Sequence, residues 1–236
     1  MAARFDTTHW SLVLAAGDRQ SPDADAALAA LCSAYWHPVY AFIRRTGHDE
    51  DSARDLTQGF FTLVLEKNYF GDAKRERGRL RTFLLTAVRH FLSNERDRER
   101  ALKRGGGAEL VPLDEDESPR EPVDPVDALT PERLYERQWA LAVLDQAMAR
   151  LRAQYEASGK ADTFDHLKPL LTGRDPETYA KVAERLNTTA GALRVAVHRM
   201  RRQFAAALRD AVAETVAVAG DVDVELRQLL QALARE

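Results

Sequence analysis

The stretch 177–213 limits the fold most, and it reads ETYAKVAERLNTTAGALRVAVHRMRRQFAAALRDAVA. Apolar residues recur there at steps of three and four, which predicts a first helix from about 176 to 186 and a second helix that begins near 190. Between them, Asn187 is a residue type that ends helices in the left-handed conformation, and Thr189 can cap the second helix. Two short helices around a tight turn form a helix-turn-helix pattern.

The second helix of this pattern has one apolar and one cationic side. Its apolar stripe consists of Leu193, Val197, Met200, Phe204 and Leu208, whereas Arg194, His198, Arg199, Arg201 and Arg202 lie mostly off it. Small residues at 190–192 would let the helix N-terminus approach DNA closely. A helical hairpin with a solvated arginine face is the alternative, but the small residues together with the cations favour DNA binding.

Composition restricts the class of protein. The 236 residues suffice for one large or two small domains, and the single cysteine, Cys32, excludes an internal disulfide and a cysteine-based zinc site. The sequence shows neither a signal peptide nor the roughly 20 apolar residues of a membrane span. We therefore expect a cytoplasmic protein without membrane insertion.

Charge is distributed unevenly along the chain, although the formal net charge is only −3. Residues 71–107 hold eleven Lys and Arg against five Asp and Glu, and residues 177–209 hold seven against two. Between them, residues 108–137 hold ten acids against three arginines. The chain thus has two basic modules separated by an acidic spacer, which is the pattern a function must explain.

Hydrophobic periodicity predicts helices elsewhere and no strand alternation. We expect helices over 24–46, with a kink at Pro38, from Asp49 or Asp51 to about 65, and over 79–103, with a loop at 68–78. The second of these carries apolar residues on two neighbouring faces, which indicates a wide core face or, alternatively, an exposed docking strip. The last two turns of the 79–103 helix are almost wholly charged and are expected to leave the bundle.

The segment 108–131 holds five prolines and few large apolar residues, so we expect an extended tether. Further helices are predicted over 131–157, 164–171 and 222–233. The predicted fold is all-α, with a helical domain at 1–107, the acidic linker at 108–131, a helix-turn-helix domain at 132–213 and a C-terminal helical extension at 214–236.

Four blocks of the sequence are similar to blocks of a known family. They are Thr7, Thr8, Trp10, Ser11, Leu12 and Val13 of a TTxWSLV motif, DSARDLTQGFF at 51–61, RGRLRTFLLTAVRHFLSNE at 77–95 and YAKVAERLNTTAGALRVAVHRMRR at 179–202. Their types and order resemble the bacterial RNA polymerase sigma factors of the extracytoplasmic-function (ECF) group, in particular the TTxWSLV-containing variants. The resemblance covers nearly the whole chain.

The resemblance implies a sigma factor that binds core RNA polymerase and directs promoter-specific transcription initiation. Its first domain would dock on the clamp helices of the largest polymerase subunit, and the polymerase flap would be a second contact. Docking would involve Asp55, Gln58 and an exposed Phe61. The loop 68–78 and the helix after it would read and melt the −10 element, with Tyr69 or Phe70 stacking on an unstacked base. The residues at matching positions are Tyr69, Phe70, Lys74, Arg75, Arg77, Arg81, Arg89, His90, Asn94 and Arg98.

The second domain would read the −35 element through its helix-turn-helix. The resemblance places Ala192, Arg194, Val195 and His198 at base edges and Thr189, Arg199, Arg201 and Arg202 mostly at phosphates. The acidic linker matches the segment that threads toward the polymerase active-site channel. The tail 214–236 would be an extra helix that packs on the promoter-reading domain and acts as a brake.

The docking motif departs from the family, which usually has acidic residues where this chain has Arg54 and Gly59. Thr57 lies between them, and we hypothesise that phosphorylation of Thr57 supplies the missing negative charge. The alternative is that Thr57 is an ordinary buried helix residue. An anti-sigma factor or a Ser/Thr protein kinase would then be a further partner of a chain that is monomeric when free.

Other functional classes fit less well. The six histidines are scattered, and no catalytic motif, metal-ligand cluster or cofactor-binding glycine loop is present, so we expect neither an enzyme nor a cofactor. An operator-binding transcriptional regulator that acts without core polymerase is the main alternative. A helical adaptor protein would not need two basic modules.

Overall fold

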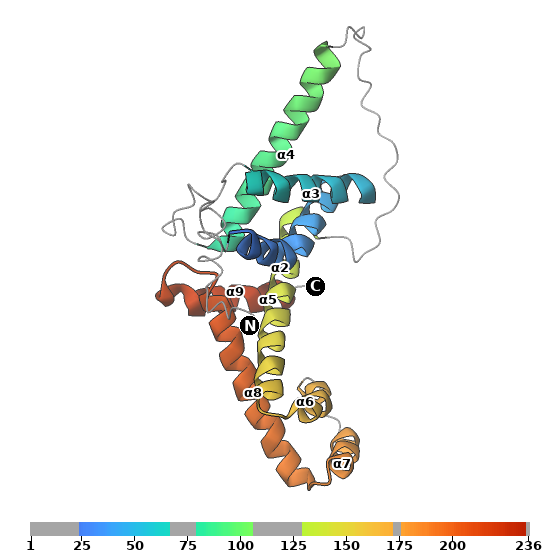
Figure 1. Cartoon of the computed structure of the whole chain (residues 1–236), viewed down its shortest axis with the longest axis vertical. Helices are drawn as coiled ribbons and strands as arrows, with labels where there is room; N and C mark the ends of the chain where they lie inside the picture. Colours follow the sequence, from blue (N-terminus) through green and yellow to red (C-terminus); the bar gives the residue numbers. More distant parts are fainter. Residues whose placement is uncertain (1–23, 67–78, 106–128, 172–175, 235–236) are drawn as a thin grey trace.

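The computed structural model describes residues 24–66, 79–105, 129–171 and 176–234, and the regular elements in these ranges are all helices (Figure 1). The all-α prediction is confirmed for this part of the chain. Predictions for 1–23, 67–78 and most of the linker lie outside the described residues. The α-helices are α2 (Ala24–Arg45), α3 (Glu50–Glu66), α4 (Leu80–Gly105), α5 (Pro131–Ala157), α6 (Ala161–Leu167), α7 (Pro176–Arg185), α8 (Ala190–Ala213) and α9 (Val222–Ala234), with 3-10 turns at η3 (Lys168–Leu170) and η4 (Ala219–Asp221).

Helix starts follow the capping residues of the sequence. Oδ1 of Asp49 accepts the Ser52 amide at 2.8 Å before α3, and Oγ1 of Thr130 accepts the Arg133 amide at 3.3 Å before α5. The helix expected at 164–171 begins earlier, at Ala161, and ends as η3. The reason is Gly159, whose φ of +70° reverses the chain so soon after α5 that a new helix starts two residues later.

The first hydrophobic core joins helices from both ends of the chain. It contains α2, α3, α4 and the N-terminal half of α5, together with the C-terminal half of α8 and with α9. Tyr35 of α2 stacks on Trp139 of α5, with ring centroids 4.3 Å apart and planes 7° apart. Phe42 meets Tyr135 edge to face at 6.3 Å. The start of α5 is therefore packed among the helices of the predicted 1–107 domain.

A second core lies at the other end of α5 and α8, which run side by side between the two cores (Figure 1). Here Leu151 of α5 packs with Phe164 of α6 and with the buried stripe of α8. Tyr155 and Phe164 meet edge to face at 5.7 Å. These contacts hold α7 and the start of α8 at one tip of the molecule, while the last turns of α4 project from the opposite end, as expected from their charge.

Among the described residues, none of the helices combines the length and apolar character needed to cross a membrane.

Candidate nucleic-acid interface

The turn between α7 and α8 has the geometry expected from the sequence. Asn187 adopts φ +48°, in the left-handed region, and the Thr188 amide donates to the carbonyl of Ala183 at 2.9 Å. Thr189 then takes an extended conformation, and its Oγ1 accepts the Ala192 amide at 3.1 Å. These bonds satisfy one free carbonyl at the end of α7 and one free amide at the start of α8, which stabilises the turn between the two helices.

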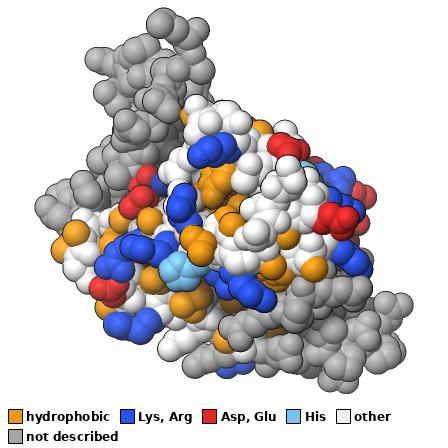
Figure 2. Space-filling model, turned by 90° about the horizontal axis from the view of Figure 1, so that it is seen from below, with side chains coloured by type: hydrophobic (Ala, Val, Ile, Leu, Met, Phe, Trp, Pro, Cys, Tyr) orange, Lys and Arg blue, Asp and Glu red, His pale blue; other side chains and the backbone are white. Residues whose placement is uncertain are grey.

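The two sides of α8 differ as predicted. Leu193, Val197 and Met200 are at most 1% exposed and face α5, α6 and α7. On the opposite side lie the exposed residues Ala192, Arg194, Val195, His198, Arg199 and Arg202. Figure 2 looks at this end of the molecule and shows Lys and Arg side chains gathered around a histidine and exposed apolar groups. Val195 is 60% exposed, so an apolar contact is available within the cationic surface.

Arg201 behaves differently from the other predicted phosphate contacts on α8. Its Nε donates to the carbonyl of Leu171 at 3.1 Å, and a terminal nitrogen donates to the carbonyl of Leu170 at 2.9 Å. The guanidinium thus caps the end of η3 and ties it to α8. In this arrangement Arg201 holds the fold together, whereas Arg194, Arg199 and Arg202 face outward.

The predicted −10 residues of α4 divide between two sides of the helix. Arg81 and His90 are nine positions apart, which is about two and a half turns of a helix with about 3.6 residues per turn. Their side chains therefore point to opposite sides of α4. His90, Asn94 and Arg98 follow at four-residue steps and are exposed. Arg81 and Arg89 face the C-terminal half of the chain instead.

These two arginines are paired with acids of the chain itself. Arg81 is 9% exposed, and its Nε lies 2.7 Å from Oε1 of Glu225 on α9, although the N–H is not aligned as a hydrogen bond. A terminal nitrogen of Arg81 lies 3.2 Å from Oε1 of Glu136 on α5. Arg89 pairs with Glu132, one turn before Glu136 on α5. The pKa of the Glu132 carboxyl lies below its usual value, mainly because of a backbone hydrogen bond at Glu132 and secondly because of the hydrogen bond from Arg89.

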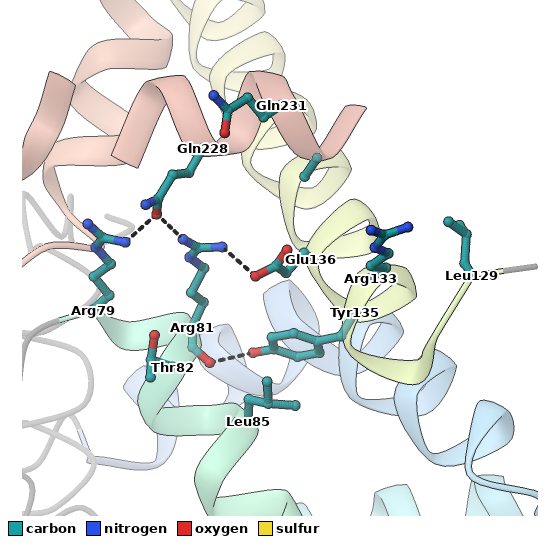
Figure 3. Close-up of a pocket in the computed structure, with 11 residues that line it drawn as sticks. Arg79, Arg81, Thr82, Leu85, Leu129, Arg133, Tyr135, Glu136, Gln228 and Gln231 are labelled. Carbon is teal, nitrogen blue, oxygen red and sulfur yellow. Dashed lines mark hydrogen bonds and ion pairs between the residues drawn. The ribbon is translucent and has the colours of Figure 1, made fainter. Parts of the chain in front are cut away.

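A cleft of about 420 Å³ opens beside Arg81, between α4, α5 and α9 (Figure 3). Arg79, Arg81 and Gln228 converge on one of its walls, where the side-chain oxygen of Gln228 accepts from both guanidinium groups. The hydroxyl of Tyr135 donates to the backbone carbonyl of Arg81 at 3.0 Å. The start of α4 is thereby fixed to both α5 and α9.

The sequence prediction missed Glu225 and Arg79. The sequence did contain a signal, because Glu225 falls on the apolar face that Val222, Leu226 and Leu229 form along the last helix. Burial of a carboxylate on such a face is costly unless it pairs with a cation. In the structure the side chain of Glu225 is 3% exposed. Its partner Arg81 lies 144 positions earlier in the sequence, so the pairing itself was not predictable.

The predicted docking residues on α3 also divide. Asp55 and Gln58 are exposed, but the expectation that Phe61 is exposed is wrong, since Phe61 is only 4% exposed. Its ring stacks on Trp36 of α2 at 5.7 Å and meets Phe60 edge to face at 5.2 Å. The core face of α3 is therefore wide enough to bury both phenylalanines, which was the alternative to an exposed strip.

Thr57 lies on the buried side of α3. It is 0% exposed, and its hydroxyl donates to the carbonyl of Ala53 at 2.6 Å. A kinase would reach this hydroxyl only if α3 opened locally. Arg54 is the other unusual residue of the motif. One terminal nitrogen of its guanidinium lies 2.9 Å from Oε1 of Glu50 and the other lies 3.8 Å from Oδ1 of Asp51, so neighbouring acids offset its charge.

The predicted residues Tyr69, Phe70, Lys74, Arg75 and Arg77 lie outside the described residues. Within the described ranges, no group of three or more His, Cys, Asp and Glu side chains is placed to hold a metal ion. Neither the models of known protein families, nor the curated proteins, nor the solved structures match this chain.

Proposed function

We propose that this chain is a sigma factor of the ECF type, which binds core RNA polymerase and directs it to promoters. The observation that carries the proposal is the capped helix-turn-helix at one tip, with an apolar side buried and a cationic side open. Arg194, Val195 and His198 are the side chains proposed to meet base edges, with Arg199 and Arg202 at phosphates. Val195 supplies the apolar surface that a thymine methyl group favours.

The second support comes from the opposite end of the molecule. The exposed row His90, Asn94 and Arg98 on α4 offers hydrogen-bond donors and positive charge to the −10 region. Asp55 and Gln58 on α3 are the proposed contacts with the polymerase clamp helices. Separate surfaces for polymerase and for two DNA elements are what a sigma factor needs.

We further propose two functional lobes, centred on the two hydrophobic cores and connected through α5 and α8. The chain is proposed to act as a monomer within the cytoplasm and to supply no catalytic step of its own.

Association with purified bacterial core RNA polymerase tests this proposal. We expect the chain to co-elute with core polymerase on size exclusion, and the double variant Asp55→Ala, Gln58→Ala to lose most of this association. Asp145→Ala is the control, because Asp145 is an exposed acid on α5, away from the docking motif. If the chain never co-elutes yet binds duplex DNA tightly alone, the operator-binding regulator is the correct class.

A further inference from the structure

The first turn of α4 is held by the C-terminal segment at three points. The Leu80 amide donates to the carbonyl of Thr215 at 3.0 Å. Arg79 Nε lies 3.1 Å from one carboxylate oxygen of Glu225, and Arg81 Nε lies 2.7 Å from the other. Gln228, one turn further along α9, accepts from both arginines (Figure 3). One segment therefore binds both the backbone and the side chains of this turn.

The chemistry at this point is that of an anion bound by two guanidinium groups. A carboxylate with an oxygen directed at each arginine, and an amide oxygen beside it, presents three acceptors to adjacent cations. A DNA backbone phosphate presents the same kind of acceptors to arginine. Glu225 thus offers Arg79 and Arg81 what a nucleic acid would offer them.

The acid is also unusual for its position. Glu225 is buried on a face of α9 that otherwise buries Val222 and Leu229. A buried carboxylate is costly unless it is paired, so the docking of α9 is weakened when Arg79 and Arg81 no longer pair with Glu225. The same pairs that fix α9 occupy the cations at the beginning of α4.

We propose that α9 is an intramolecular competitor of DNA, in which Glu225 and Gln228 occupy Arg79 and Arg81 in place of a backbone phosphate. This inference rests on the proposed function, since it concerns the helix assigned there to the −10 element. Glu132 on Arg89 and Glu136 on Arg81 extend the same masking along α4. In the free chain, α9 thus keeps this side of α4 from DNA, and detachment of α9 exposes Arg79 and Arg81 together.

Detachment of α9 would uncover the part of the first core that Val222 and Leu229 cover, but it would not affect the core around the helix-turn-helix. It is the last helix and joins α8 through the short connection 214–221, and its ion pair between Asp223 and Arg209 is exposed and therefore contributes little to its docking. The second core, which carries the helix-turn-helix, contains no residue of α9 among the described residues. Detachment therefore leaves the promoter-reading tip intact.

The test compares full-length Glu225→Gln with wild type, and Asp223→Asn is the matched control. Both variants remove one negative charge from α9, but only Glu225 faces Arg79 and Arg81. The probe is a fluorescent duplex with an unpaired central bubble of mixed sequence, since phosphate contacts do not depend on sequence. We expect Glu225→Gln to bind about tenfold to a hundredfold more tightly, as fits the loss of a charged hydrogen-bonded contact. Asp223→Asn should bind within about twofold of wild type.

The salt dependence of DNA binding shows whether a higher affinity of Glu225→Gln comes from new phosphate contacts. Two newly available phosphate contacts should steepen the slope of log affinity against log salt by about 1.4 to 1.8. A tighter variant with an unchanged slope would overturn the proposal, and so would equal affinities of Glu225→Gln and wild type.

A second measurement keeps the proposal testable if Glu225→Gln does not fold. Hydrogen exchange of the wild-type amides of α9 should accelerate when saturating DNA is added, while the amides of α3 should not change. Unchanged exchange in α9 at saturation would refute the competition. The proposed function fails separately, if neither wild type nor Glu225→Gln associates with core polymerase.

Discussion

Substitution of Trp139 by alanine tests the contact that joins the start of α5 to α2. Trp139 is only 2% exposed, stacks on Tyr35 at 4.3 Å and lies 6.1 Å from the ring of Tyr135. Removal of a buried tryptophan costs about 3 to 5 kcal/mol of unfolding free energy. For a chain of this size, about 2 to 4 °C in Tm corresponds to each kcal/mol, so we expect a fall of about 6 to 20 °C.

The assay is thermal unfolding followed by circular dichroism at 222 nm. The matched control is Leu141→Ala, two positions along the same helix, because Leu141 is 39% exposed and should cost less than about 1 kcal/mol. If both variants lower Tm equally, the start of α5 is not docked against α2. The first core would then not include α5, and the proposal that α5 and α9 cover the arginines of α4 would lose its support.

Three further predictions concern single groups. Thr189→Ala should lower the unfolding free energy by about 1 kcal/mol in urea titrations, because the Ala192 amide loses its acceptor; an unchanged midpoint would mean that the cap is not formed. Burial raises the pKa of the Cys32 thiol to about 11. Its reaction with a thiolate-directed reagent at pH 8 should therefore be at least about a hundredfold slower in the folded than in the denatured chain. Equal rates would place Cys32 at the surface. The pKa of Glu132 is lowered in the folded chain, so the ionised carboxylate stabilises the fold above the ordinary carboxyl pKa, and this contribution is lost as pH falls through the folded pKa. Glu132→Gln should therefore flatten the dependence of unfolding free energy on pH between neutral and acidic pH. An unaltered dependence would contradict the lowered pKa.

Local features were predictable from sequence because short-range physics decides them. Asn187, Thr189 and Thr130 occupy the turn and cap positions that their side chains favour, and the apolar spacing gave the helices to within a few residues. The start of α6 was missed because the chain reversal at Gly159 leaves a good helix former free to begin a turn earlier.

Long-range features were not predictable in this way. Helical spacing cannot tell whether Phe61 meets water or Trp36, because both arrangements give the same pattern on α3. Nor can it pair Arg81 with Glu225, which lies 144 positions away. An acid on an apolar face indicates a buried cation partner, but only the packing of α9 against α4 shows which one.

Run-off transcription with purified bacterial core RNA polymerase tests the central claim most directly. Fragments of genomic DNA serve as templates, and the 5′ ends of the transcripts are mapped. We predict discrete start sites that require the chain, that share a sequence element near −35, and that disappear with the double variant Arg194→Ala, Arg199→Ala. Absence of chain-dependent transcripts with both wild type and Glu225→Gln, although core polymerase is active with another sigma factor, would contradict the account.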